Sequence, residues 1–170
     1  MNDKDPNDSA ESLCLQQAAN DSAKKVVKSC EGQFDAHKTD CNKFLKAVAN
    51  ELGIHDFKDG DDADAMIDFL EASPSGWTKL GTGKHSKAHE EADTGAFVVA
   101  GMKSTDMKKV NGHVSVITSG PMVASAGDKT DYPRGFWGQL GGEGKKCEGM
   151  NYSFPAERKT GLRYYRRDLP

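Results

Sequence analysis

The spacing of hydrophobic residues divides this chain into a helical first half and a second half rich in strands. Between Leu13 and Ser73 the apolar residues recur at the spacing of amphipathic helices. After Trp77 they occur instead in short runs bounded by glycine and proline, which is typical of strands. Helices followed by strands indicate an α+β protein, with N-terminal helices packed on an antiparallel sheet.

The same patterns place the individual elements. We expect one helix or two broken helices over 13–29, a polar loop over 31–39, and helices over 39–53 and 65–73. A polar helix is expected over 84–93, and a loop over 124–131. The predicted strands are 77–80, 96–102, 112–121 and 162–167, with a short strand or irregular wall over 132–142.

Composition and length narrow the class of protein. We expect residues 1–11 to form a disordered tail, because they are charged and have nothing to pack, and residues 12–170 to form a single domain. The net charge of −3 gives no case for a nucleic-acid binder. No apolar run is long enough for membrane insertion, and the N-terminal residues do not resemble a signal peptide.

The first candidate for chemistry is Cys41, at the start of the 39–53 helix. Asp40 is a suitable N-cap, and Phe44, Leu45 and Val48 continue the apolar face that Cys41 begins. A helix N-terminus stabilises negative charge, so we expect this position to lower the pKa of the thiol. A buried structural cysteine is the alternative interpretation.

His113, at the start of a predicted strand, is the candidate base for Cys41. Cysteine hydrolases pair a thiol at a helix N-terminus with a histidine on a facing strand, and the imidazole accepts the thiol proton. A third group should orient the imidazole. The sequence leaves this group open between the backbone carbonyl of Trp137, the side chain of Asp131, and three further side chains: Asp128, Gln139 and Asn151.

Three other clusters suggest binding, and a simpler interpretation is favoured for each. His85 and His89 have the i, i+4 spacing of metal ligands, but no third ligand is evident, so we expect a solvated helix face and no metal. The acidic loop over 56–64 lacks the ligand spacing of a calcium-binding EF-hand. The basic cluster over 158–167 is expected to be the polar face of an edge strand.

Several segments together resemble the first family of type VI secretion amidase effectors. The resemblance runs in the same order and with similar gaps from about residue 40 to residue 142. Its most similar segments are Asp40–Phe44, Val48–Gly53, Ala63–Asp68, Trp77–Leu80, Val98–Lys103 and Gly112–Pro121.

This resemblance implies a papain-like NlpC/P60 fold and a secreted antibacterial peptidoglycan amidase. Such an enzyme cleaves the bond between D-glutamate and meso-diaminopimelate in stem peptides, and it needs no cofactor. The family's nucleophile falls on Cys41 and its base on His113. Its third group falls within 132–138; the family has cysteines there, whereas this chain has Gly135, Phe136 and Trp137, which leaves a backbone carbonyl.

The resemblance also implies partners and a location. We expect a monomer, made in the cytoplasm, exported by type VI secretion components and active in the periplasm of a target bacterium, where a cognate immunity protein can occlude the cleft. In that oxidising compartment a disulfide that joins Cys14 or Cys30 to Cys147 is plausible. The alternative function is a non-catalytic cell-wall-binding module on the same fold.

Overall fold

The structure is a computed structural model that describes residues 13–170. The predicted disordered tail over 1–11 lies outside the described residues. The helices that follow a first helical turn over 13–16 are α2 (Asp21–His37), α3 (Cys41–Glu51), α4 (Ala63–Glu71), α5 (His85–Asp93), α6 (Ser104–Met107), α7 (Met150–Ser153) and α8 (Arg158–Gly161). The strands are β1 (Trp77–Thr82), β2 (Phe97–Met102), β3 (His113–Ile117), β4 (Val123–Ala124), β5 (Asp131–Tyr132), β6 (Arg134–Trp137), β7 (Lys145–Gly149) and β8 (Arg163–Arg167).

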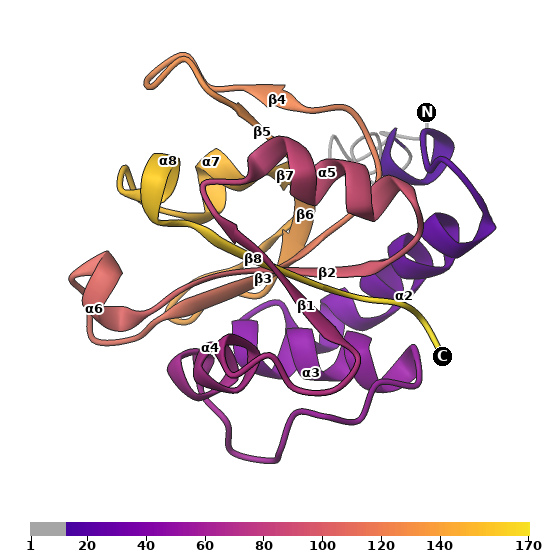
Figure 1. The fold of residues 1–170 in the computed structure, drawn as a ribbon, viewed down its shortest axis with the longest axis horizontal. Coiled ribbons are helices and arrows are strands. Elements are labelled where there is room, and N and C mark those ends of the chain that lie inside the picture. Colours follow the sequence, from indigo (N-terminus) through magenta and orange to yellow (C-terminus); the bar gives the residue numbers. More distant parts are fainter. Residues whose placement is uncertain (1–12) are drawn as a thin grey trace, which may run out of the picture.

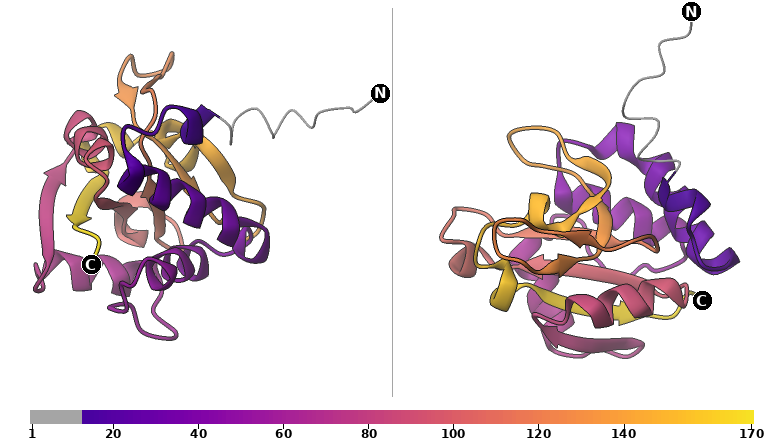
Figure 2. Two further views of the ribbon diagram at one scale, coloured as in Figure 1. Left: turned by 90° about the vertical axis from the view of Figure 1, so that its right-hand side faces the viewer. Right: turned by 90° about the horizontal axis from the view of Figure 1, so that it is seen from above.

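An antiparallel sheet of six strands, in the order β1-β8-β2-β3-β6-β7, forms the middle of the fold. Helices α3 and α4 lie on one side of this sheet, and α5 and α7 lie on the other (Figure 1). Helix α2 packs against α3 and the β6–β7 edge, away from strand β1 (Figure 2). The mixed helix and sheet organisation confirms the predicted α+β class.

Strand β2 shows why the sheet is covered on both faces. All six of its residues are buried, as the continuous apolar run predicts. Phe97 and Val99 belong to the hydrophobic cluster under α2, α3 and α4, whereas Val98 and Ala100 belong to the cluster on the opposite face. This alternation follows from the two-residue period of a strand.

The predicted loop over 31–39 is wrong, because α2 continues to His37. Cys30 and Phe34 are both buried and extend the stripe that Val26 and Val27 begin one turn earlier. Packing of this stripe outweighs the low helix propensity of Gly32, which lies between Cys30 and Phe34. Asn20 is the N-cap of α2, and its side chain accepts a hydrogen bond from the Ala23 amide at 2.9 Å. Because this cap starts a new helix, the 13–29 region contains two helical segments.

The basic cluster does not lie on an edge strand. Strand β8 pairs with both β1 and β2, so it is internal to the sheet. Its arginines form ion pairs: Arg163 with Asp106 at 2.8 Å, Arg166 with Glu91 at 3.1 Å, and Arg167 with Asp56. Each positive charge is therefore balanced by a carboxylate.

A disulfide joins Cys14 to Cys147, with the two Cα atoms 5.8 Å apart. It connects the start of the described chain to strand β7. The hydrophobic pattern did not predict this strand. Cys30 and Cys41 are free and buried. Of the two pairings left open above, the structure therefore has the one with Cys14.

The predicted loop over 124–131 is flanked by β4 and β5, which pair as a small hairpin outside the main sheet. Within the described residues no helix has the length and apolar character needed to cross a membrane.

Candidate active site

Cys41 is the first residue of α3 and is almost completely buried. The predicted N-cap is confirmed: the Asp40 carboxylate accepts hydrogen bonds from the backbone amides of Asn42 at 3.0 Å and Lys43 at 3.1 Å. The helix is fixed below the sheet by Phe44, Leu45 and Val48, none of which has exposed surface. Cap and apolar face together hold the thiol at the helix start.

His113 is the first residue of β3, where it pairs with Met102 of β2. Gly112 precedes it, and a Cβ there would lie 2.3 Å from a carboxylate oxygen of Asp64. Asp64 accepts a hydrogen bond from the Ser104 amide at 2.8 Å and also bonds the Ser104 hydroxyl. Only glycine fits at 112, since α4 holds the chain leading into β3 at close range.

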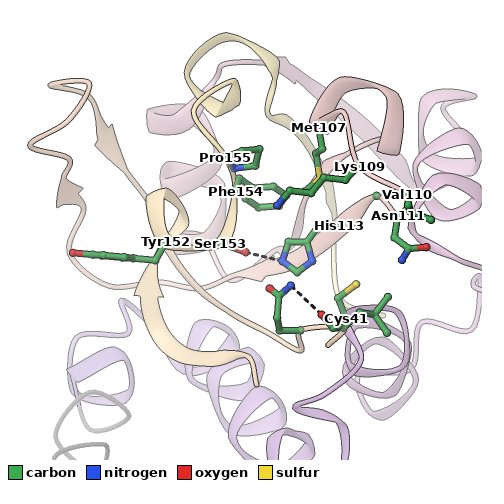
Figure 3. Close-up of a pocket in the computed structure, with 13 residues that line it drawn as sticks. Cys41, Met107, Lys109, Val110, Asn111, His113, Tyr152, Ser153, Phe154 and Pro155 are labelled. Atoms are coloured by element: carbon green, nitrogen blue, oxygen red, sulfur yellow. Dashed lines mark hydrogen bonds between the residues drawn. The ribbon is translucent and has the colours of Figure 1, made fainter. Parts of the chain in front are cut away.

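Cys41 and His113 line the same cleft, which has a volume of about 450 Å³ (Figure 3). Its other walls come from the α6–β3 connection, from the segment after β6 and from α7, with the lining residues Met107, Lys109, Val110, Asn111, Gly112, Gln139, Leu140, Tyr152, Ser153, Phe154 and Pro155. The structure thus brings together the two residues that the sequence singled out.

The wall after β6 approaches α3 closely. The carbonyl of Lys38, between α2 and α3, accepts hydrogen bonds from the amides of Gln139 at 3.0 Å and Gly144 at 2.7 Å. A Cβ at Gly138 would lie 2.5 Å from the carbonyl oxygens of both His37 and Asp40. Glycine at this position is therefore required to bring Gln139 to the cleft beside Cys41.

Ser153, the last residue of α7, contacts the histidine. Its hydroxyl oxygen lies 2.8 Å from His113 Nε2 and 2.8 Å from the hydroxyl of Ser115. The Phe154 ring packs edge-on against the imidazole, with the centroids 5.0 Å apart. As drawn in Figure 3, the imidazole lies between Ser153 and Cys41. Ser153 therefore holds the ring through Nε2 and leaves Nδ1 as the other ring nitrogen, while the Cys41 thiol donates to Asn42 Oδ1 at 3.4 Å.

The sequence-based candidates for the third group lie elsewhere. Asp131 is exposed on the β4–β5 hairpin, and the described structure shows no hydrogen bond from it or from the Trp137 carbonyl to His113. Asp128 binds Tyr132 and Arg158. The other two candidates form no hydrogen bond to His113 among the described residues: Gln139 lines the cleft and its side-chain amide donates to the Leu140 carbonyl at 3.5 Å, and Asn151 Oδ1 is buried without a hydrogen-bond partner. Serine at the end of a four-residue helix carries no sequence pattern, so Ser153 was missed.

The two histidines of α5 do not lie on a solvated face, and they have separate partners. His85 is buried, with Nδ1 at 2.7 Å from the Tyr164 hydroxyl and Nε2 at 3.1 Å from the Lys159 carbonyl. His89 Nε2 lies 2.7 Å from the carbonyl oxygen of Gly120. Both imidazoles are structural links between α5 and its neighbours, which removes the support for a metal-dependent hydrolase.

Burial changes the expected acidity of both cleft residues. It raises the pKa of Cys41 to about 11, outweighing backbone hydrogen bonds from Val114, Cys41 and Asn42 that lower it, and the Asp40 charge raises it further. Burial, and secondarily the positive charge of Lys109, lowers the pKa of His113 to about 4. The expectation that the helix N-terminus lowers the thiol pKa is therefore wrong, because burial outweighs the amides of the helix start, and thiol and imidazole are both neutral at pH 7.

A comparison with protein-family models and with curated protein sequences finds no match to this chain.

Proposed function

We propose that this protein is a cysteine peptidoglycan amidase of the NlpC/P60-like, papain-related class, which cleaves the D-glutamyl–meso-diaminopimelate bond of stem peptides. The observation that carries the proposal is the arrangement of Cys41 and His113, one at the first position of a helix and the other at the start of a strand, on facing walls of one cleft. This is the arrangement that thiol hydrolases need.

The first half of the reaction forms an acyl-enzyme. His113 Nδ1 accepts the Cys41 proton as the sulfur attacks the amide carbonyl, so a neutral pair becomes charged only when substrate has entered. The Asp40 side chain occupies the amides of Asn42 and Lys43. The Cys41 amide remains at the helix start, and we assign it to the developing oxyanion.

The second half releases the product. The imidazolium of His113 gives its proton to the leaving amine, the C–N bond breaks, and a thioester to Cys41 remains. Water then attacks the thioester and gives a proton to His113, which returns it to the sulfur as the C–S bond breaks; the product leaves as the carboxylic acid, which releases its proton to the solvent. The enzyme ends in its starting protonation state, and no cofactor is consumed.

Digestion of purified peptidoglycan, followed by mass spectrometry of the products, tests the proposal. We expect the wild-type protein to release disaccharide-dipeptides, and Cys41→Ala or His113→Ala to lower the rate by about a thousandfold or more. Cys30→Ala is the matched control, because Cys30 is the other free buried thiol but lies outside the cleft. Full activity of Cys41→Ala would refute the assignment.

One observation is consistent with a second candidate, a non-catalytic cell-wall-binding module, as well as with the amidase. The pKa of Cys41 is raised rather than lowered, so burial keeps the thiol protonated at pH 7. In a sedimentation assay, a binding module would pellet with intact sacculi and release no product. The amidase would release product from the same material.

The exposed side chains at the rim of the cleft support the proposal that a partner protein covers it. The large hydrophobic side chains that are exposed in the described chain, Val110, Leu140 and Tyr152, all line this cleft. An apolar rim around a polar cleft is typical of a protein interaction site. This supports the proposal of an antibacterial effector delivered by type VI secretion, whose own cell protects itself with an immunity protein seated over the cleft.

A further inference from the structure

Among the described residues that line the cleft, one side chain carries a charge at pH 7. Lys109 is the lining residue that carries a permanent charge; the other lining side chains are uncharged polar or apolar groups, and His113 is neutral at pH 7. The chain as a whole has a net charge of −3. A lone positive charge beside the reacting pair of an acidic protein indicates an anionic group on the ligand.

Lys109 differs from its neighbouring lysines in having no carboxylate partner. Lys103 forms an ion pair with Asp68 at 2.5 Å, and Lys108 lies 4.0 Å from Glu157. Among the described residues no carboxylate lies within ion-pair distance of Lys109. As drawn in Figure 3, its side chain extends toward Phe154, another residue of the cleft wall, and its charge lies near enough to His113 to lower the pKa of the imidazole.

The backbone that carries Lys109 is anchored on both sides. The Lys109 amide donates a hydrogen bond to the Ser104 carbonyl at 3.1 Å, and Ser104 is in turn held by Asp64 of α4. Gly112, on the other side, packs directly against the same carboxylate. The connection between α6 and β3 therefore presents Lys109 from a fixed base, which limits the entropy lost when the side chain binds.

We propose that Lys109 binds a carboxylate of the substrate that lies beside the scissile amide, and so restricts the enzyme to peptides that carry one. This inference rests on the proposed amidase function. A stem peptide offers two such groups: the α-carboxylate that the γ-linked D-glutamate leaves free, and the distal carboxylate of meso-diaminopimelate. Both are the same chemistry for a lysine, a charge-assisted hydrogen bond to an anionic oxygen.

Three synthetic stem tetrapeptides separate the two sources. The first carries both carboxylates, the second has D-isoglutamine in place of D-glutamate, and the third has L-lysine in place of meso-diaminopimelate. We compare kcat/KM of the wild-type protein with that of Lys109→Met, which keeps the length of the side chain and removes its charge. Lys109→Arg tests retention of charge, and Lys108→Met is the matched control, since Lys108 is adjacent but outside the cleft.

We expect Lys109→Met to lose about tenfold in kcat/KM on the first peptide, because a charge-assisted hydrogen bond is removed. On the peptide that lacks the bound carboxylate, the variant and the wild-type protein should be equal. That peptide identifies which carboxylate is bound. Lys109→Arg and Lys108→Met should both stay close to wild type. An equal loss on all three peptides, or no loss on any, would overturn the inference.

Binding measured without turnover separates this inference from the proposed function. In a Cys41→Ala background, calorimetry with the first peptide should give a Kd about tenfold weaker after Lys109→Met. If the wild-type protein cleaves no peptide but this difference in Kd is found, the amidase proposal fails and the role of Lys109 stands. If cleavage occurs and the Kd is unchanged by Lys109→Met, the role of Lys109 fails and the amidase proposal stands.

Discussion

Cys41 and His113 are both buried, and burial moves their pKa values in opposite directions, to about 11 and about 4. Each shift favours the neutral form, so the cleft holds a thiol and an imidazole rather than an ion pair at pH 7. Chemical reactivity of the thiol in the free protein is therefore a poor indicator of function. A slow reaction with iodoacetamide is expected of the amidase as well as of the binding module.

The depressed pKa of His113 predicts a loss of stability in acid. The unfolded chain binds a proton at this residue near pH 6.5, whereas the folded chain does so only near pH 4, so protons favour unfolding between these values. Urea denaturation at pH 7 and near pH 4.5 should show that the wild-type protein loses about 2–3 kcal/mol more than His113→Gln. His85, whose pKa burial also lowers, is present in both proteins and cancels. Equal losses would contradict the buried, neutral state of His113.

Ser153 is a positioning residue for His113, and its removal should affect turnover more than binding. Ser153→Ala deletes the hydroxyl 2.8 Å from His113 Nε2, which leaves the ring free to rotate or to adopt the wrong tautomer. We expect kcat to fall about tenfold with KM unchanged. The ¹⁵N shifts of the imidazole should change with it, a signal that a purely structural role would not alter.

Ser115→Ala is the control for Ser153→Ala. It removes the other hydroxyl that Ser153 contacts and leaves the Ser153–His113 contact in place. This variant should keep most of its activity. If Ser153→Ala has wild-type kcat and unchanged imidazole shifts, the third position of the site belongs to another group.

At the level of elements, the sequence predicted the helices and strands that its pattern of hydrophobic residues marks. Helix α3 buries apolar residues at helical spacing, whereas β2 and β3 are short runs in which every residue is buried. Cys41 and His113 were found because each is the first residue of such an element. The capping carboxylate of Asp40 was also visible in the sequence, since it acts on neighbouring residues.

The elements that the sequence missed are held by contacts distant along the chain. Strand β7 contains one apolar residue, Cys147, and is fixed by its disulfide and by pairing with β6. Helix α7 is too short to show a period, so Ser153 could not be placed beside His113. The end of α2 was misjudged because its polar residues obscured the spacing of Cys30 and Phe34. The acidity of Cys41 depends on burial by the whole fold, which no local pattern records.

At the scale of the whole molecule, the disulfide connects the start of the described chain to strand β7, which precedes one wall of the cleft. Cys147 lies in β7, which leads directly into α7 and Ser153. Cys14 precedes α2 and α3, and Cys41 is the first residue of α3. The crosslink therefore joins the segment before α2 and α3, which lead to the nucleophile Cys41, to the segment that holds the base His113 in place.

This crosslink closes a loop with a sequence separation of 133, so its loss should destabilise the protein substantially. Chain entropy predicts about 3–5 kcal/mol, because the unfolded chain regains the freedom that so long a loop removes. We expect reductant to lower the midpoint of urea denaturation of the wild-type protein. The Cys14→Ser/Cys147→Ser variant should start at the lower midpoint and show no response to reductant, which separates this bond from any effect on Cys30 or Cys41. A wild-type midpoint that is the same with and without reductant, at full reduction by thiol count, would show that the fold does not depend on the bond.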